Sequence, residues 1–323
     1  MVDLNSKMMV MKDFYGLAFL GYNSGKKRFP RVRAVTYMQQ DRVYLGDCRA
    51  VLETFPAASI DLIFTSPPYA DNRRKSPYTG VGIDAYVEWF LPISNELRRV
   101  LKPDGSFVLN IKERAIHGER QTYVLELILR MKQQGWRWTE EYIWHKKNCY
   151  PGKWPNRFRD AWERCLHFTK EKRFKMFQDA VMVPMGNWRE KRLSKLSDED
   201  LVRHESNVSS GLGRKVSNWV GRRLAYPTNV LYLSTECSNR NHGATFPKAL
   251  PTWFIHLFTR KGDLVLDPFM GSGTTAIACI KTNRHFIGIE VTPQYYEVAC
   301  QAIEREKAKV LTTNLHSSAG CAK

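Results

Sequence analysis

Apolar and polar positions follow two different periods along the chain, and the two periods succeed one another repeatedly. Mostly apolar runs at 61–65, 106–111 and 263–267 predict short buried strands. Helical spacing of apolar residues at 86–101 and 123–134 predicts amphipathic helices between them. Strands that alternate with helices are typical of an α/β protein with a mostly parallel sheet.

Two stretches lack this regular pattern. The first forty residues are basic and include the run GKKRFPRVR, and a long middle segment is rich in Trp, Arg and Gly/Ser. The pattern predicts five parts: a basic leader at 1–40, a first α/β half at 41–150, an irregular basic insert at 151–241, a second α/β half at 242–311 and a flexible tail at 312–323. An insert of about ninety residues is longer than ordinary loops.

Composition narrows the class of protein. The 323 residues are 43% hydrophobic and 25% charged, which excludes a disordered, collagenous or coiled-coil chain. No apolar run reaches the ~18 residues of a membrane helix, and the apolar stretch at 14–21 lacks a signal-peptide cleavage site. The seven cysteines form no C-x-x-C pair, so we expect no metal site and a reducing compartment.

Charge adds a partner. Lys and Arg number 50 against 32 Asp and Glu, a formal net charge of +18. Such a surplus favours a polyanion, either nucleic acid or an acidic membrane surface.

A glycine-rich motif, DPFMGSGTT at 267–275, joins a predicted buried strand to a helix. Gly271 and Gly273 let the backbone approach a ligand closely, and Glu290 ends the next strand, where it can accept hydrogen bonds from a ribose diol. No Lys follows the second glycine as in a phosphate-binding P-loop. A tight strand-to-helix turn without a ligand is the alternative.

A second motif, TSPPY at 65–69, follows another predicted buried strand. Consecutive prolines donate no backbone hydrogen bonds and hold the chain extended, so the Ser66 hydroxyl and nearby carbonyls can face a substrate. The Tyr69 ring offers a face for stacking a planar ring. An ordinary Ser-Pro-Pro turn is the alternative for this motif alone, and a nicotinamide-dependent dehydrogenase would explain the glycine-rich motif but not this one.

In this order the two motifs resemble those of the S-adenosylmethionine-dependent amino-methyltransferases of DNA, in their circularly permuted β group. TFPKALP at 245–251 and WHKKN at 144–148 are similar to further blocks of that family, and the resemblance extends over about 42–306. It implies a Rossmann-like α/β fold with a mostly parallel twisted sheet, circularly permuted, with the irregular basic insert serving target recognition.

The resemblance also implies S-adenosyl-L-methionine as cofactor and a set of residues around it. The implied cofactor-binding residues are Asp47, Phe246, Asp267, Phe269, Gly271, Gly273, Thr274 and Glu290. Asp47 equally fits the N-cap of the helix that follows it.

The resemblance assigns catalysis to Ser66, Pro67, Pro68 and Tyr69. TSPPY is similar to the form found in enzymes that methylate N4 of cytosine; N6 of adenine is the nearest alternative. Ser66 Oγ and the Pro67 carbonyl would accept the amine hydrogens of a flipped base, and Tyr69 would stack on it. Trp144 is a second stacking candidate, with core packing as its alternative.

Double-stranded DNA is therefore the expected partner, and a companion restriction endonuclease would act separately. The expected DNA contacts are Arg73, Arg74, Arg157, Arg189, Arg222 and Arg223. We expect a cytoplasmic protein that associates with the nucleoid through DNA, without membrane or metal. A catalytically silent nucleic-acid-binding protein on the same fold is the alternative from another class.

Overall fold

The computed structural model describes residues 38–70, 80–149, 151–153, 155–186, 195–198, 220–235 and 246–319. The chain divides into two compact units. The first comprises Met1–Met176 and Asn229–Lys323, and the second is Phe177–Thr228.

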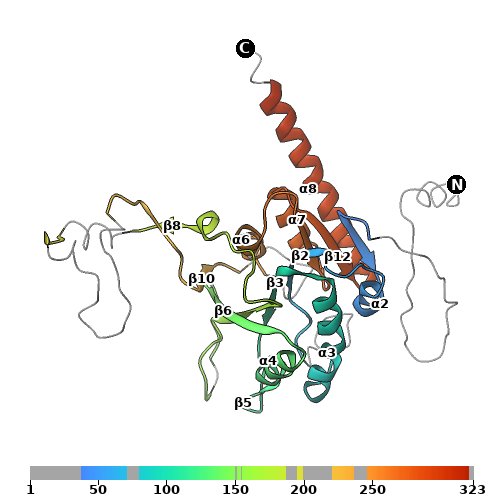
Figure 1. The fold of residues 1–323 in the computed structure, drawn as a ribbon. Coiled ribbons are helices and arrows are strands. Elements are labelled where there is room, and N and C mark those ends of the chain that lie inside the picture. Colours follow the sequence, from blue (N-terminus) through green and yellow to red (C-terminus); the bar gives the residue numbers. More distant parts are fainter. Residues whose placement is uncertain are drawn as a thin grey trace, which may run out of the picture. The chain divides into compact units, whose positions relative to one another are not determined.

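An eight-stranded sheet forms the centre of the first unit (Figure 1). In spatial order its strands are β1 (Arg42–Leu45), β12 (His285–Glu290), β11 (Leu264–Asp267), β2 (Ile60–Thr65), β3 (Leu101–Ile111), β7 (Trp162–Thr169), β6 (Arg137–Lys146) and β10 (Val230–Leu233). All neighbouring pairs are parallel except that β7 runs antiparallel to β3 and to β6. The predicted mostly parallel α/β sheet is confirmed.

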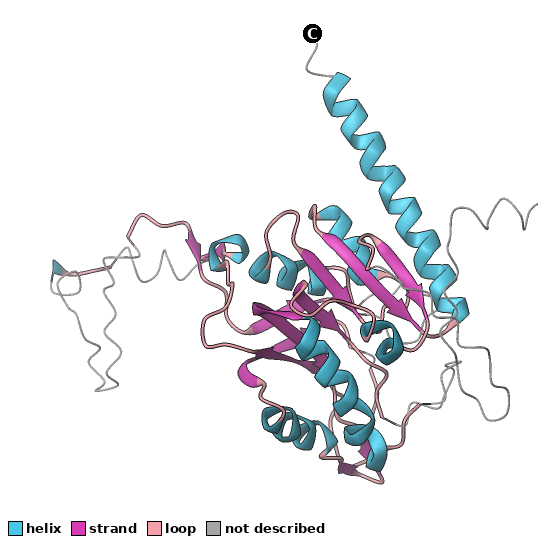
Figure 2. Cartoon of the chain, turned by 45° about the vertical axis from the view of Figure 1, so that its right-hand side comes forward, coloured by secondary structure: helices cyan, strands magenta, loops and turns pink. Residues whose placement is uncertain are grey.

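Helices cover both faces of this sheet (Figure 2). One group of helices, packed in sequence against one another, consists of α2 (Cys48–Leu52), α3 (Ile83–Val100) and α4 (Tyr123–Gln133). The other group consists of α6 (Ala249–Phe258), α7 (Thr274–Lys281) and α8 (Pro293–Ala319). Since both faces are covered, every residue of β2 is buried, which explains its continuous apolar run.

Alternate side chains of β2 serve the two layers. Ile63 belongs to the core formed with α2, α3 and α4, whereas the ring of Phe64 stacks on that of Phe254 in α6, with centroids 5.5 Å apart. This division follows from the two-residue period of a strand.

The strand order brings distant parts of the chain side by side. β11 lies between β12 and β2, and its residue Leu266 pairs with Ile63 on one side and Ile287 on the other. On the far side of β12, Leu45 pairs with Glu290. Because these four strands are parallel, their carboxyl ends meet at one edge of the sheet.

Two boundaries differ from the sequence-based expectation. β7 and β10 belong to the central sheet, although both fall within the range 151–241 assigned to the irregular insert. The polar residues Glu163, Arg164 and His167 obscured the strand pattern of β7. These residues are accommodated because each has a polar partner across the sheet.

The C-terminal helix α8 also extends beyond the expected end at residue 311 and continues to Ala319. The sequence offers no Gly or Pro between Pro293 and Gly320, so no helix-breaking residue stops it earlier. Of the 312–323 segment expected to form a tail, the residues up to Ala319 are therefore helical.

Small elements complete the described chain. In the first unit, β4 (Ala115–Ile116) and β5 (Glu119–Arg120) form a hairpin. The second unit contains a short 3₁₀ helix (Gln178–Val181) and the antiparallel pair β8 (Val183–Pro184) and β9 (Leu224–Ala225). Among the residues described, no helix combines the length and apolarity needed to cross a bilayer.

Candidate active site

The two sequence motifs meet at the carboxyl edge of the sheet. The Thr65 hydroxyl, at the end of β2, donates a hydrogen bond of 2.6 Å to Oδ1 of Asp267, at the end of β11. Both residues are buried. TSPPY and the glycine-rich motif are thus fixed next to each other, although 202 residues separate these two positions.

The Asp267 carboxylate organises the start of the glycine-rich motif. Besides Thr65, it accepts hydrogen bonds from the Thr275 hydroxyl at 2.6 Å and from the Phe269 backbone N–H at 3.1 Å. Burial raises the pKa of Asp267 to about 6, against the lowering effect of these three donors. Its position behind the turn makes Asp267 a support for the motif's backbone.

The glycine-rich turn needs glycine at two positions because Gly271 and Gly273 have φ angles of 53° and 88°. Gly273 is also required for packing, since a Cβ atom there would lie 3.3 Å from Ala299 of α8. Gly273 caps α7 without a side chain, and Thr274 begins the helix. The turn therefore presents backbone N–H groups of the helix start at the carboxyl edge.

Glu290 stands at the same edge, at the end of β12. Its Oε2 accepts from the Gly271 N–H and its Oε1 from the Thr292 N–H, each at 2.8 Å. The side chain is 7% exposed, and burial raises the pKa of Glu290. Each carboxylate oxygen keeps a second lone pair, so the group can hold the turn and still accept a hydroxyl proton.

The remaining predicted cofactor residues take different positions. Asp47 is the N-cap of α2 and accepts from the Arg49 N–H at 2.9 Å, as the alternative interpretation of Asp47 had it. The Phe246 ring lies edge-on to Phe64, with centroids 5.2 Å apart. Phe269 packs on α3, stacked on Phe90 at 6.4 Å.

The TSPPY segment leaves the sheet in an extended form and is held from two sides. The Pro68 carbonyl accepts a hydrogen bond of 3.0 Å from the Tyr86 hydroxyl. The Tyr69 hydroxyl donates at 2.6 Å to Oε2 of Glu163, and the Ser66 side chain lies within hydrogen-bonding range of that same hydroxyl. Burial, followed by the nearby Glu163 charge, raises the pKa of Tyr69 well above its usual value.

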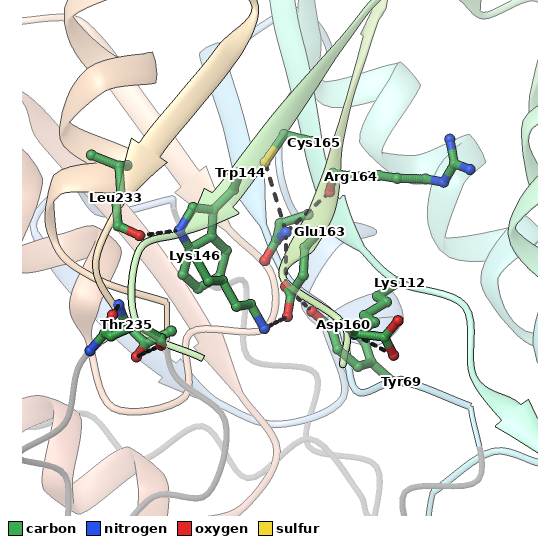
Figure 3. A network of polar contacts seen from close by, with 12 residues as sticks. Tyr69, Lys112, Trp144, Lys146, Asp160, Glu163, Arg164, Cys165, Leu233 and Thr235 are labelled. Atoms are coloured by element: carbon green, nitrogen blue, oxygen red, sulfur yellow. Dashed lines mark hydrogen bonds and ion pairs between the residues drawn. The ribbon is translucent and has the colours of Figure 1, made fainter. Parts of the chain in front are cut away.

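The partners of Tyr69 were missed at the sequence level. Glu163 also accepts from Lys146 Nζ at 2.6 Å and from Asn110 Nδ2 at 3.3 Å (Figure 3). Three strands supply these residues: β7 provides Glu163, β6 Lys146 and β3 Asn110. A charged residue inside an otherwise apolar strand was the available signal.

Trp144 is in the interior. It is 3% exposed, its indole N–H donates to the Leu233 carbonyl at 3.0 Å, and Lys146 Nζ lies 5.1 Å from its ring centroid (Figure 3). This environment is that of core packing, the alternative considered for this residue.

The predicted DNA-contacting arginines are distributed over separate regions. Arg157 pairs with Asp160 at 3.2 Å, which also binds Lys112 and Arg120. Arg222 and Arg223 are exposed in the second unit. Arg73, Arg74 and Arg189 lie outside the described residues.

A mostly parallel sheet with an acidic strand end, a glycine-rich turn and a second acidic strand end defines a Rossmann-like methyltransferase fold. Residues 60–301 match the N6/N4 family model described as a DNA methylase, and the chain belongs to this family. It is 32% identical over 277 residues to the type II methyltransferase M.PvuII of Proteus hauseri, covering 78% of this chain and 80% of that protein.

Solved structures agree with this assignment. The cytosine-N4-specific PvuII DNA methyltransferase superposes with a TM-score of 0.61 at 26% identity, covering 85% of this chain and 94% of that one. A Thermus thermophilus protein in complex with S-adenosyl-L-methionine gives a TM-score of 0.54 at 26% identity, with coverages of 82% and 93%. The protein is a DNA methyltransferase of the N4/N6 family.

Proposed function

We propose that this DNA methyltransferase transfers a methyl group from S-adenosyl-L-methionine to the exocyclic N4 of a cytosine in a specific DNA sequence. The observation that carries the proposal is the hydrogen bond between Thr65 and Asp267, which joins the TSPPY segment to the glycine-rich turn at one edge of the sheet. Similarity to a cytosine-N4-specific enzyme and the TSPPY form of the motif favour cytosine.

The residues at the edge fit S-adenosyl-L-methionine. Glu290 offers carboxylate lone pairs to the ribose hydroxyls, while the turn at Gly271 and Gly273 offers backbone N–H groups to the amino-acid end. Phe246 and Asp47 would lie toward the adenine, with Phe269 and Thr274 lining the turn. When bound, the cofactor supplies an electrophilic methyl group on a positively charged sulfur.

The task of the protein is to prepare a weak nucleophile. The lone pair of an exocyclic amine is delocalised into its ring, so the nitrogen is planar and unreactive. Ser66 Oγ and the Pro67 carbonyl would each accept one N–H, which favours a pyramidal nitrogen with its lone pair directed at the methyl group. A new N–C bond forms as the C–S bond breaks, and the amine then releases one proton to solvent.

This route needs no covalent enzyme intermediate. The cysteine that lies near the catalytic segment, Cys165, is buried, and burial raises the pKa of its thiol well above the usual value. A neutral thiol is a poor nucleophile. Positioning and hydrogen bonding, with Tyr69 as the stacking partner of the base, carry the proposed chemistry.

The substrate would be duplex DNA with its target base flipped out, because the N4 amine is inaccessible inside the stack. The net charge of +18 favours binding to the phosphate backbone, with Arg157, Arg222 and Arg223 among the candidate contacts. The protein would act in the cytoplasm at the nucleoid and protect sites against a separate restriction endonuclease.

The test is expression with a plasmid in a host that lacks DNA methylation, followed by single-molecule sequencing of the plasmid. We expect 4-methylcytosine at one short sequence motif. Detection of 6-methyladenine instead would establish the adenine alternative within the same family. A plasmid without modified bases, from cells containing soluble protein, would contradict methyl transfer and favour the silent DNA-binding alternative.

A further inference from the structure

The carboxylate nearest the catalytic segment has no part in the proposed function so far. Glu163 lies on β7, the antiparallel strand, and is 6% exposed. Both of its oxygens are engaged: Oε1 accepts from Lys146 Nζ at 2.6 Å, and Oε2 accepts from the Tyr69 hydroxyl at 2.6 Å and from Asn110 Nδ2 at 3.3 Å. A buried carboxylate with three donors is held in one orientation.

Lys146 anchors this carboxylate on the side away from Tyr69. Lys146 lies on the neighbouring strand β6, where Trp144 is paired directly with Glu163. The Lys146 ammonium also lies over the Trp144 ring, as Figure 3 shows. Glu163 therefore keeps its negative charge in the interior because a fixed ammonium offsets it.

The direction of the hydrogen bonds follows from the chemistry of the groups. A carboxylate can only accept, so the Tyr69 hydroxyl must give its single proton to Glu163. The Tyr69 oxygen is then left with lone pairs alone, and toward Ser66 it can act only as an acceptor. Ser66, within range of that oxygen, directs its own proton to it.

The consequence lies at Ser66 Oγ. With its proton directed at Tyr69, this oxygen meets an incoming group with lone pairs alone. An exocyclic amine presents two N–H donors, so an oxygen that only accepts is the required complement. A Ser66 hydroxyl free to rotate would spend part of its time pointing its proton at the amine.

We propose that Glu163, anchored by Lys146, is a positioning residue that orders the Tyr69 and Ser66 hydroxyls so that Ser66 Oγ accepts from the target amine. Glu163 acts through Tyr69 and does not itself contact the base. This inference rests on the proposed function, since it concerns the amine that the enzyme methylates.

The test compares Glu163→Gln, Tyr69→Phe and the double variant with the wild type. A glutamine can donate to Tyr69 and so reverse the chain, while phenylalanine keeps the ring and removes the link. Methyl transfer from labelled S-adenosyl-L-methionine to plasmid DNA from a methylation-free host gives kcat, and calorimetry gives the cofactor Kd. The matched control is Glu141→Gln on β6, where the carboxylate pairs with Arg164.

We expect each single variant to lose about 100-fold in kcat with an unchanged cofactor Kd. The double variant should lose no more than either single variant, because both changes break the same chain. Glu141→Gln should retain the wild-type kcat. An active wild type with a fully active Glu163→Gln, or losses that multiply in the double variant, would overturn the inference alone.

Two further outcomes are decisive. If the wild type transfers no methyl group to any DNA, the proposed function fails and this inference fails with it. If Glu163→Gln does not fold, as judged by its melting temperature, Tyr69→Phe decides: a reduced kcat at unchanged cofactor Kd supports the inference, and a wild-type kcat overturns it.

Discussion

Thr65 Oγ1 lies 2.6 Å from Asp267 Oδ1, and this contact joins the two halves of the active site. Thr65 is the last residue of β2, and Asp267 is the last residue of β11. The parallel pairing of these strands brings the residues to the same level, so the catalytic segment and the cofactor turn begin side by side.

Ser66 is the residue whose loss should separate binding from chemistry. Ser66→Ala removes one proposed acceptor for the amine while leaving the cofactor turn intact. We expect the cofactor Kd and DNA affinity to stay unchanged and kcat to fall by about 100-fold or more. Calorimetry, DNA-binding titration and methyl transfer measure the three quantities.

Ser59→Ala is the matched control for this prediction. Ser59 lies just before the amino end of β2, where its hydroxyl donates to the Pro56 carbonyl. This variant should methylate DNA at the wild-type rate. Full activity of Ser66→Ala would refute the assigned role of Ser66.

Glu290 should govern cofactor affinity. Glu290→Gln retains one acceptor oxygen but replaces the other with an NH₂ group that faces a backbone N–H, because both carboxylate oxygens accept from the backbone. Hydrogen bonds to charged groups contribute about 1.5–3 kcal/mol, so the cofactor Kd should rise about 10- to 100-fold. Calorimetric titration without DNA checks this, and Glu297→Gln, an exposed change on α8, should leave the Kd unaltered.

Asp267 should make stability depend on pH in an identifiable direction. Burial raises its pKa from 3.8 to about 6, so between these values the folded state binds more protons than the unfolded state. The stability that Asp267 contributes is therefore fully present below about pH 4 and is lost as the pH rises through about 6.

Asp267→Asn removes this titration. Urea unfolding from pH 4.5 to pH 7 should show the variant gaining stability relative to the wild type as the pH rises, by at most about 1.4 kcal/mol per pH unit. A stability difference that is constant over this range would contradict the raised pKa of Asp267.

The second unit should contribute to DNA binding through its exposed arginines. Arg223→Ala removes one candidate phosphate contact. The slope of log affinity against log salt concentration should become shallower by about one unit, because one fewer counterion is released. Fluorescence anisotropy with a duplex measures this slope; Lys261→Ala, an exposed change just before β11, should not alter it, and equal slopes for both variants would contradict the assignment.

Much of the fold could be predicted from local patterns. The run at 61–65 and the helical spacing at 86–101 correspond to β2 and α3, because burial on both faces and on one face leave different periods in the sequence. β7 was not predicted, since its polar residues hide the strand period. Their partners lie on other strands, which a local pattern does not contain.

By itself the sequence determined the class of sheet, the two motifs and, from their order, the family. Apolar period, turn glycines and prolines act within a few residues of one another, so they can be found in one dimension. Only the tertiary structure decided that Glu163 and Lys146 stand behind Tyr69, that Asp47 caps a helix and that Trp144 is buried. These outcomes depend on which strands become neighbours, and the pairing of β3, β7 and β6 is what brings a distant carboxylate to the catalytic tyrosine.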